Sequence, residues 1–334
     1  MNRRGKRVTI AATAAMLASL AGASFAGTAA SATTRTPAHP AATTAVTMHL
    51  IPGTDLRMPQ VKLHHWFGAH MALRPRAGVV PQRGATTVLG HRVSPALGGG
   101  NLLYNGGPVA HTSRLYLLFW GTQWSSDPNG VEDYLYNYTN GICSSGDYWV
   151  GTNAQYTDSS GAGPSCANGS AFQGWAQDTG GPAPANASQA QIAAEAVAGA
   201  DYFGALGTDA QVAVISPSGT HPDGFPSTGF CAWHSDTSDP SGNEVSYTNL
   251  PYVLDAGTSC GEDSVRSTLD GFSIVEGHEF SETQTDPELN AWIDNTGEEI
   301  GDKCAWTNLF AESDAWGTFA QQPLWDNSTS SCQA

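Results

Sequence analysis

A short motif near the C-terminus combines residue types that bind metal ions and move protons. His278, Glu279 and Glu282 form the pattern H-E-x-x-E, one residue away from the H-E-x-x-H of zinc peptidases. Residues four apart share one face of a helix, so His278 and Glu282 can both point at a single metal ion. Glu279, beside them, would be the general base that takes a proton from water. The motif predicts a metal-dependent hydrolase.

A hydrolytic metal site needs about three protein ligands, so a third ligand is expected beyond the motif. Asp286 precedes Pro287, which ends the helix and allows the chain to turn back. Glu299 is the first choice for the third ligand, Asp302 the second and Asp286 the third. One His with two carboxylates is a harder ligand set than two His with one Glu. Zn²⁺ is the leading metal, and Ca²⁺, Mn²⁺ and iron are competitors.

A hydrolase must also stabilise the oxyanion that forms on the scissile carbonyl group. His234 is the first candidate for this catalytic role, ahead of Tyr247 and Tyr252. Serine chemistry is not predicted. The non-catalytic alternative for the motif is that His278 and Glu282 form an ion pair on a solvated helix face.

The motif requires a helix that holds it in place. Residues 262–285 are the longest helix candidate, with an apolar face formed by Leu269, Phe272, Val275 and Phe280. Each glycine within such a helix weakens it by roughly 1 kcal/mol relative to alanine. Gly277, directly before the motif, leaves room for a neighbouring strand to approach.

The remaining elements are predicted from apolar runs and from capping residues. Strands are expected at residues 114–120, 210–215, 229–234 and 245–254. Helices are expected at residues 127–138 and 188–203, the second with an N-cap region at Ser188. Long stretches rich in Gly, Ser, Asn and Asp connect them, so loops occupy much of the chain.

Six cysteines, all beyond residue 140, predict disulfides if the chain is exported. Pairing between sequence neighbours is the expected arrangement: Cys143–Cys166, Cys231–Cys260 and Cys304–Cys332. A cysteine metal site is not favoured, because the sequence contains no C-x-x-C. The cysteine at position 304 would help to fix the loop that carries Glu299 and Asp302.

Residues 1–32 have the three features of a secretory signal peptide. Four basic residues fall within the first seven positions, an Ala-rich apolar run covers residues 8–25, and Ala30-Ser31-Ala32 supplies an A-x-A cleavage site. No later run is long and apolar enough to span a bilayer. The expected product is a secreted, extracellular protein without membrane insertion.

Charge separates the rest of the chain into two parts. Residues 33–100 hold seven basic residues and one acid, whereas residues 101–334 hold three basic residues and 29 acids. A domain this acidic does not suit nucleic acid or anionic lipid, because phosphate binding needs clustered Lys and Arg. It attracts cations and basic segments instead.

Residues 33–100 are rich in Ala, Thr, Pro and Arg and lack a sustained hydrophobic period, which is typical of a linker or pro-segment. Their positive charge suits a pro-segment that binds the acidic domain; the alternative is a disordered spacer. The patch at residues 63–67 could anchor the segment. The folded domain, residues 101–334, is expected to start near Asn101 and is long enough for one sizeable core.

Four blocks of the acidic domain, residues 102–109, 115–121, 230–234 and 299–304, resemble the EXORDIUM-like (phosphate-induced protein) family, and the resemblance covers most of residues 101–310. Bacterial relatives of this type look like secreted metallopeptidases with H-E-x-x-E-x-x-x-D-P and a later E-x-x-D. This chain matches those motifs at His278, Glu279, Glu282, Asp286, Pro287, Glu299 and Asp302. Plant relatives do not keep the H-E pair and are described as cell-wall growth proteins, so the shared scaffold does not by itself imply peptidase activity.

These patterns predict an α+β fold: a zincin-like single domain with a mixed β-sheet, a long active-site helix and disulfide-stapled loops. The expected function is hydrolysis of extracellular peptide bonds, with a protein or peptide substrate and the basic pro-segment as partners. The alternative is a non-catalytic, extracellular EXORDIUM-like protein that binds cations or cell-wall glycan.

Overall fold

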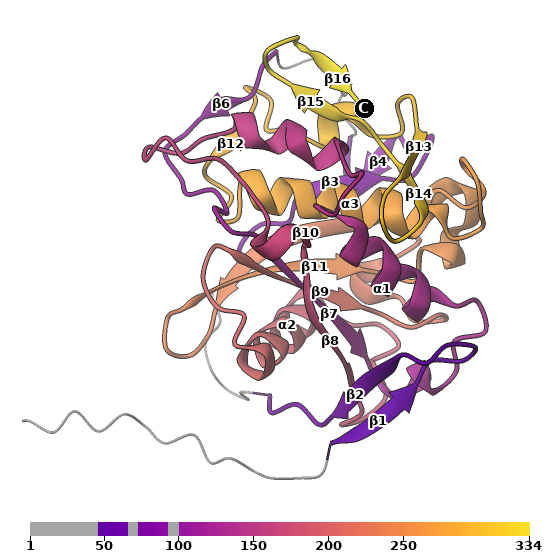
Figure 1. The fold of residues 1–334 in the computed structure, drawn as a ribbon. Coiled ribbons are helices and arrows are strands. Elements are labelled where there is room, and N and C mark those ends of the chain that lie inside the picture. Colours follow the sequence, from indigo (N-terminus) through magenta and orange to yellow (C-terminus); the bar gives the residue numbers. More distant parts are fainter. Residues whose placement is uncertain (1–45, 66–72, 93–99) are drawn as a thin grey trace, which may run out of the picture. The chain divides into compact units, whose positions relative to one another are not determined.

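The computed structural model describes residues 46–65, 73–92 and 100–334, and its central feature is an eight-stranded mixed β-sheet (Figure 1). The strand order is β1-β2-β8-β7-β9-β11-β10-β3. The inner strands from β2 to β11 are parallel, whereas β1, β10 and β3 each pair antiparallel. The strands are β1 (Thr47–Leu50), β2 (Arg57–Val61), β3 (Ala77–Pro81), β7 (Arg114–Trp120), β8 (Phe172–Asp178), β9 (Ala210–Ile215), β10 (Phe230–Ser238) and β11 (Glu244–Leu250).

The central parallel strands form from continuous apolar runs. In β7, Leu117, Leu118 and Phe119 are fully buried, and every residue of β9 is buried. Such runs are typical of parallel strands that are covered on both faces. The strands predicted at residues 114–120 and 210–215 match β7 and β9, and β10 and β11 overlap the other two predicted strands.

Among the described residues, three α-helices flank the sheet: α1 (Val131–Gly141), α2 (Gln189–Phe203) and α3 (Asp270–Thr285). α1 and α3 lie on one face and α2 on the other (Figure 1). At the start of α2, the Ser188 hydroxyl and the Gln191 side chain each accept a hydrogen bond from the other residue's backbone N–H, a capping box that fixes the helix start. The fold is therefore mixed α+β, as expected. Within the described part of the chain, none of the helices has the length and apolar character to span a bilayer.

Helix α3 is shorter than predicted and is buried on every side. It begins at Asp270 rather than at residue 262, because the Asp270 carboxylate accepts the backbone N–H of Val265 and holds the preceding residues in a turn. All 16 of its residues are buried, so the expectation of a single apolar face is wrong. Gly277 permits this packing, since a Cβ there would lie 3.0 Å from Gln321 Oε1 on a neighbouring strand.

The folded unit begins well before Asn101, which corrects the boundary expected from composition. β1, β2 and β3 all lie within residues 33–100, yet β2 pairs with β8 and β3 pairs with β10. Strand pairing uses backbone N–H and C=O groups, so short edge strands need no sustained hydrophobic pattern. Composition alone therefore does not separate these strands from a linker.

Of the predicted anchor at residues 63–67, the structure describes residues 63–65. His65 Nε2 lies 2.7 Å from Glu195 Oε2 on α2, and the Leu63 backbone N–H donates to the Asp178 carboxylate. This half of the patch contacts the domain that follows it. Trp66 and Phe67 lie outside the described residues, as does the predicted signal peptide at residues 1–32.

Small sheets and disulfides build the loops around the main sheet. In the described residues, four pairs of short strands form: β4 (Thr87–Val88) with β5 (His91–Arg92), β6 (Leu103–Tyr104) with β12 (Trp292–Ile293), β13 (Phe310–Ser313) with β14 (Thr318–Gln321), and β15 (Leu324–Asp326) with β16 (Ser331–Gln333). The disulfides are Cys143–Cys166, Cys231–Cys260 and Cys304–Cys332. They confirm the predicted neighbour pairing.

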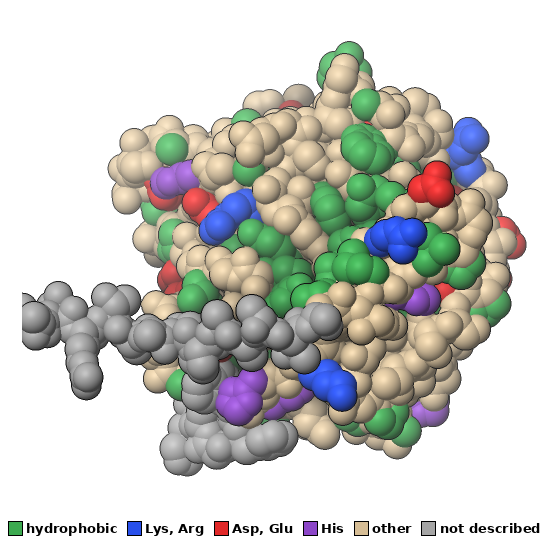
Figure 2. Space-filling view, turned by 60° about the horizontal axis from the view of Figure 1, so that its bottom comes forward, with side chains coloured by type: hydrophobic (Ala, Val, Ile, Leu, Met, Phe, Trp, Pro, Cys, Tyr) green, Lys and Arg blue, Asp and Glu red, His purple; other side chains and the backbone are tan. Residues whose placement is uncertain are grey.

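The outer strand β1 and the residue before it, Val46, leave apolar side chains exposed to water. Val46, Met48 and Leu50 are 53%, 43% and 49% exposed. Alternate residues of a strand point to the same side, so these three side chains form one stripe. Figure 2 shows hydrophobic side chains gathered on the face that comes forward from the bottom of Figure 1, where β1 and β2 lie.

β1 is tied to α1 by a buried acid–imidazole pair. His49 Nε2 lies 3.2 Å from Glu132 Oε2, and Glu132 is fully buried. Burial, together with the nearby Asp127 carboxylate, raises the pKa of Glu132 to about 8, whereas burial lowers the pKa of His49. Both groups are therefore neutral near pH 7, with the Glu132 carboxylic acid donating to the imidazole.

This pair predicts a loss of stability at high pH. The folded-state pKa of Glu132 is above its ordinary value of 4.5, so its contribution is complete below about pH 4.5 and is lost as pH rises through 8. Glu132→Gln stays neutral, so its free energy of unfolding relative to the wild type is expected to be about 5 kcal/mol higher at pH 9 than at pH 4. Urea unfolding at both pH values measures this, with Asp133→Asn as control; equal differences at the two pH values contradict it.

Candidate metal centre

Helix α3 packs against β10 and β3 and carries the H-E-x-x-E motif in its second half. His278, Glu279 and Glu282 are all 0% exposed. His278 Nε2 lies 3.0 Å from Glu282 Oε1, as expected for residues four apart on a helix. Their burial rules out the alternative of an ion pair on a solvated helix face.

The loop after α3 folds back over the motif and brings Asp302 to His278 and Glu282. One potential ligand atom from each of these three residues lies within 4.8 Å of the others. The backbone N–H groups of Gly301 and Asp302 donate to Glu282 Oε1 at 3.1 and 2.9 Å. Gly301 makes this approach possible, since a Cβ there would lie 2.8 Å from His278 Cγ. The Cys304–Cys332 disulfide holds the same loop to β16.

A second group of potential ligands shares Glu282 with the first. It consists of His234 from β10, Glu279 and Glu282, again with ligand atoms within 4.8 Å of one another. His234 Nε2 lies 3.7 Å from Glu282 Oε2, so each oxygen of Glu282 faces a different histidine. His234, expected only to stabilise the oxyanion, is thus also placed among the potential metal ligands.

Glu299 and Asp302, the first and second choices for the third metal ligand, lie in different places. Asp302 belongs to the first group, whereas neither of the two groups at this site includes Glu299. Glu299 Oε2 instead lies 2.9 Å from His234 Nε2. Asp286, the third choice, accepts the backbone N–H groups of Asn290 and Ala291 and closes the turn after α3. Geometry therefore favours Asp302 over Glu299 as a partner of His278.

The two tyrosines considered beside His234 lie elsewhere. Tyr247 packs edge-on against Trp233, which points to the opposite side of β10 from His234 because successive side chains of a strand alternate. The Tyr252 hydroxyl accepts a hydrogen bond from the Asn129 amide. His234 is thus the residue of the three that reaches the motif.

Serine chemistry was not predicted, yet the sequence contains one G-x-S-x-G pentapeptide, the motif of many serine hydrolases, at residues 257–261. In serine hydrolases this pentapeptide forms a turn between a strand and a helix, with a histidine as base. Ser259 instead lies in the 3₁₀ helix η5 (Val253–Cys260), and Cys260 is bonded to Cys231. No hydrogen bond among the described residues joins Ser259 to a histidine, so the pentapeptide does not build a serine site.

We refer to six residues as the acidic cluster: His234, His278, Glu279, Glu282, Glu299 and Asp302. Burial raises the pKa of Glu279 and of Glu299 well above the ordinary value. Burial and the nearby Asp302 carboxylate raise the pKa of Glu282 to about 7. Burial lowers the pKa of His234 to about 3. At His278 burial is outweighed by the Glu282 and Asp302 carboxylates, which raise its pKa. The metal-free cluster therefore retains protons that a cation would displace.

The unpaired atoms of the acidic cluster fit a bound cation. Both oxygens of Glu279 and Oε2 of Glu282 have no hydrogen-bond partner among the described residues. Leaving one such buried group unpaired costs about 1–3 kcal/mol. Lys303 does not balance their charge, because it pairs with Asp294 at 2.8 Å. Imidazole and carboxylate donors together suit Zn²⁺ or Mn²⁺, and carboxylates also suit Ca²⁺.

Gln322, which no sequence pattern singled out, orients the ring of His278. Its amide nitrogen donates to the Gly301 carbonyl at 2.9 Å and lies 3.0 Å from His278 Nδ1. On the other side of the ring, His278 Nε2 lies 3.0 Å from Glu282 Oε1. A metal bound at Nε2 would leave the ring proton on Nδ1, and the amide oxygen of Gln322 would then have to turn towards Nδ1 to accept it. That oxygen has no other partner among the described residues.

Removal of the Gln322 amide is therefore expected to weaken metal binding. Partners that orient a ligand histidine typically contribute 10- to 100-fold to metal affinity, so Gln322→Leu is expected to lower zinc affinity by about that factor. Gln321→Leu is the matched control, because Gln321 accepts a hydrogen bond from Tyr138. Competition with a chromogenic chelator measures both affinities; an equal loss in both variants would indicate a packing effect.

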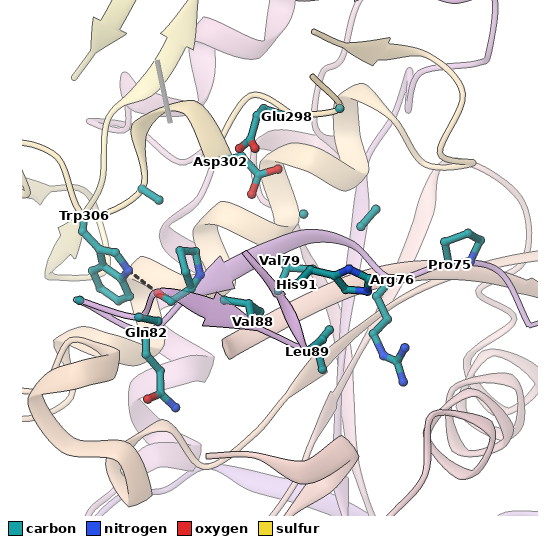
Figure 3. A pocket seen from close by; sticks show the side chains of 17 residues that line it. Pro75, Arg76, Val79, Gln82, Val88, Leu89, His91, Glu298, Asp302 and Trp306 are labelled. Carbon is teal, nitrogen blue, oxygen red and sulfur yellow. Dashed lines mark hydrogen bonds between the residues drawn. The ribbon is translucent and has the colours of Figure 1, made fainter. Parts of the chain in front are cut away.

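A pocket of about 620 Å³ opens beside the acidic cluster, between β3, the β4–β5 hairpin and the loop that carries Asp302 (Figure 3). Gly78 and Asp302 line it, together with apolar side chains that include Val79, Val88 and Trp306. The side chain of Asp302 is 11% exposed, whereas Glu282 is fully buried. Asp302 therefore connects the buried cluster with the pocket.

No family model, curated protein or solved structure matches this chain. The chemistry of the acidic cluster is therefore argued from its own geometry.

Proposed function

We propose that the protein is a secreted, metal-dependent peptidase whose active site is the acidic cluster. The observation that carries this proposal is the position of Glu282 between His234 and His278, with the unpaired oxygens of Glu279 beside it. A structural ion pair needs no second carboxyl beside it. A hydrolytic site does, because it requires a base next to the metal ligands, and Glu279 is the unpaired carboxyl that lies there.

Each side chain has a separate task in this proposal. His278 and Glu282 hold the metal ion, with Asp302 as the third ligand on one side and His234 available on the other. A bound ion would supply Lewis acidity, which polarises a carbonyl group and makes water more acidic. Glu279 takes the proton from water and returns it to the leaving amine. A cation bound beside Glu279 would lower the pKa of this carboxyl, which burial raises, and would leave it ionised to act as the base.

The arrangement of elements is compatible with a zincin-like domain and with the EXORDIUM-like resemblance. A long helix with the H-E-x-x-E motif lies under the antiparallel strand β10 of a mixed sheet. The family blocks at residues 230–234 and 299–304 contribute His234, Glu299 and Asp302 to the same cluster. Three disulfides suit an oxidising, extracellular compartment.

A structural cation site is the second candidate, and the burial of the acidic cluster favours it. Five of its six residues are at most 1% exposed. A cation held there would join α3, β10 and the loop at Asp302 without turnover of a substrate. In that case the protein is a non-catalytic extracellular protein, and its ligand binds elsewhere.

Metal content and hydrolysis, measured together, separate these functions. The secreted protein is purified without chelator, its metals are determined by mass spectrometry, and cleavage of a peptide library is measured before and after chelation and metal return. Cleavage that is lost and restored with the metal supports the peptidase. A tightly bound metal with no cleavage in any form of the chain supports the structural site. Absence of both contradicts both proposals.

A further inference from the structure

Strand β3 covers the acidic cluster directly. Gly78 is buried, and a Cβ at this position would overlap Glu282 Oε2 and lie 2.7 Å from His234 Nε2. Its φ of +50° is also a conformation that favours glycine. The backbone of β3 therefore lies against the two side chains at the centre of the cluster, where a larger residue does not fit.

β3 is the outermost strand next to β10, which carries His234. The pairing is antiparallel, with Ala77 opposite His234 and Val80 opposite Ala232, so β3 has one extra residue in the stretch that contains Gly78. Without β3, β10 would present unpaired backbone N–H and C=O groups. An extended peptide can add to such an edge as a new strand. β3 thus occupies the position that a bound peptide would take.

Two acidic side chains of the domain hold the arginines that precede Gly78. Arg76 forms a two-pronged interaction with Asp223, in which Nη2 donates to Oδ1 at 2.7 Å. Arg74 Nε lies 3.5 Å from Asp236 Oδ2, and Asp236 is fully buried. These carboxylates form binding positions for basic side chains two and four residues before the residue that faces the cluster.

On the other side of Gly78, β3 is held by apolar contacts and by one aromatic residue. Val80 is fully buried, and Val79 lines the pocket (Figure 3). The Trp306 indole N–H donates to the Pro81 carbonyl, and the Arg83 guanidinium lies over the Trp306 ring at 4.8 Å. The pocket leaves space beside β3 that the strand itself does not fill.

We infer that β3 is an internal analogue of the substrate and keeps the site closed until it is displaced. The substrate class is then an extended basic peptide, with glycine facing the acidic cluster and arginines two and four residues before it. This inference rests on the proposed peptidase function. It adds the class of substrate and the way in which access to the site is controlled. The large excess of acids in residues 101–334 attracts such peptides.

Displacement of β3 by a single side chain tests whether it covers the site. The full chain with Gly78→Leu is loaded with zinc and mixed with a chelator. Gly84→Leu is the matched control, because Gly84 also has a positive φ, +77°, but a Cβ there meets nothing within 4 Å. Gly78→Leu is expected to release zinc about tenfold faster than Gly84→Leu, since the opening of β3 no longer limits access. If Gly78→Leu, Gly84→Leu and the wild type release zinc at equal rates, β3 does not close the site.

A labelled peptide with the sequence of residues 74–83 tests the substrate position without any metal. It is expected to bind the Gly78→Leu chain and not the wild type, whose own β3 occupies the edge of β10. Peptides that carry Gly78→Leu or Arg76→Glu are expected to bind at least about tenfold more weakly, because each loses a contact or gains a repulsion. Failure to bind the Gly78→Leu chain, or equal binding of all three peptides, overturns the substrate position.

A second pair of variants keeps both tests decisive if Gly78→Leu does not fold. Val80→Asp removes the buried contact of β3 with β10, and Val61→Asp places the same change on β2, in the opposite half of the sheet. Only Val80→Asp is expected to release zinc faster and to bind the peptide. If no variant binds zinc, the proposed peptidase function is contradicted. The peptide-binding test needs no zinc, so it still shows whether a peptide can take the position of β3.

Discussion

Glu279→Gln is expected to lower the kcat of peptide hydrolysis by about 10²- to 10⁴-fold while the zinc content stays unchanged. Glutamine has the same shape as glutamate but cannot take a proton from water. Both oxygens of Glu279 are buried, have no hydrogen-bond partner among the described residues and lie beside His234 and Glu282. Steady-state kinetics and metal analysis of the same preparation measure the effect, in the wild-type chain and in the Gly78→Leu background.

Glu276→Gln is the matched control for this experiment. Glu276 lies one turn earlier on α3, is equally buried, and also has two oxygens without a partner in the described part of the chain. It belongs to neither group of potential ligands. Its kcat is expected to stay close to that of the wild type. If Glu279→Gln hydrolyses peptides as fast as Glu276→Gln does, Glu279 is not the base.

Glu282→Gln is expected to abolish the stabilisation of the fold by zinc. A metal at about 1,000 times its Kd raises the free energy of unfolding by about 4 kcal/mol. Glu282 belongs to both groups of potential ligands, so its loss removes a carboxylate from either possible site. Urea unfolding with zinc and with chelator measures the difference in each variant.

Glu299→Gln separates the two carboxylates that the sequence proposed as the third ligand. Glu299 lies next to His234 and outside both groups, so this variant is expected to keep most of the zinc-dependent stabilisation. Asp302→Asn is expected to lose it, because Asp302 shares a group with His278 and Glu282. The opposite result would make Glu299 the third ligand. Undiminished stabilisation in Glu282→Gln would argue against a metal at this cluster.

Local sequence patterns were sufficient where the structure depends on neighbouring residues. His278 and Glu282 meet because a helix places residues four apart on one face. β7 and β9 form where continuous apolar runs must be buried. Ser188 starts α2 because its side chain satisfies free backbone groups at the helix end.

Other features depend on contacts between distant parts of the chain and had weaker signals. The early strands β1, β2 and β3 join the sheet through backbone hydrogen bonds, which leave little trace in composition. Gln322 reaches His278 from the region between β14 and β15 without any motif. Gly78 is one of many glycines in the sequence, and its contact with both Glu282 and His234 distinguishes it.

The sequence by itself determined the chemical types at this site: a histidine, an adjacent carboxylate and a second carboxylate on one helix, with further acids in the following loop. These follow from helical periodicity and from donor chemistry, which are local properties. The tertiary structure decided that His234 joins them, that Asp302 rather than Glu299 lies beside His278, and that β3 lies against Glu282 and His234. Those positions result from side-chain packing and strand pairing between residues far apart in the sequence, and no local pattern encodes them.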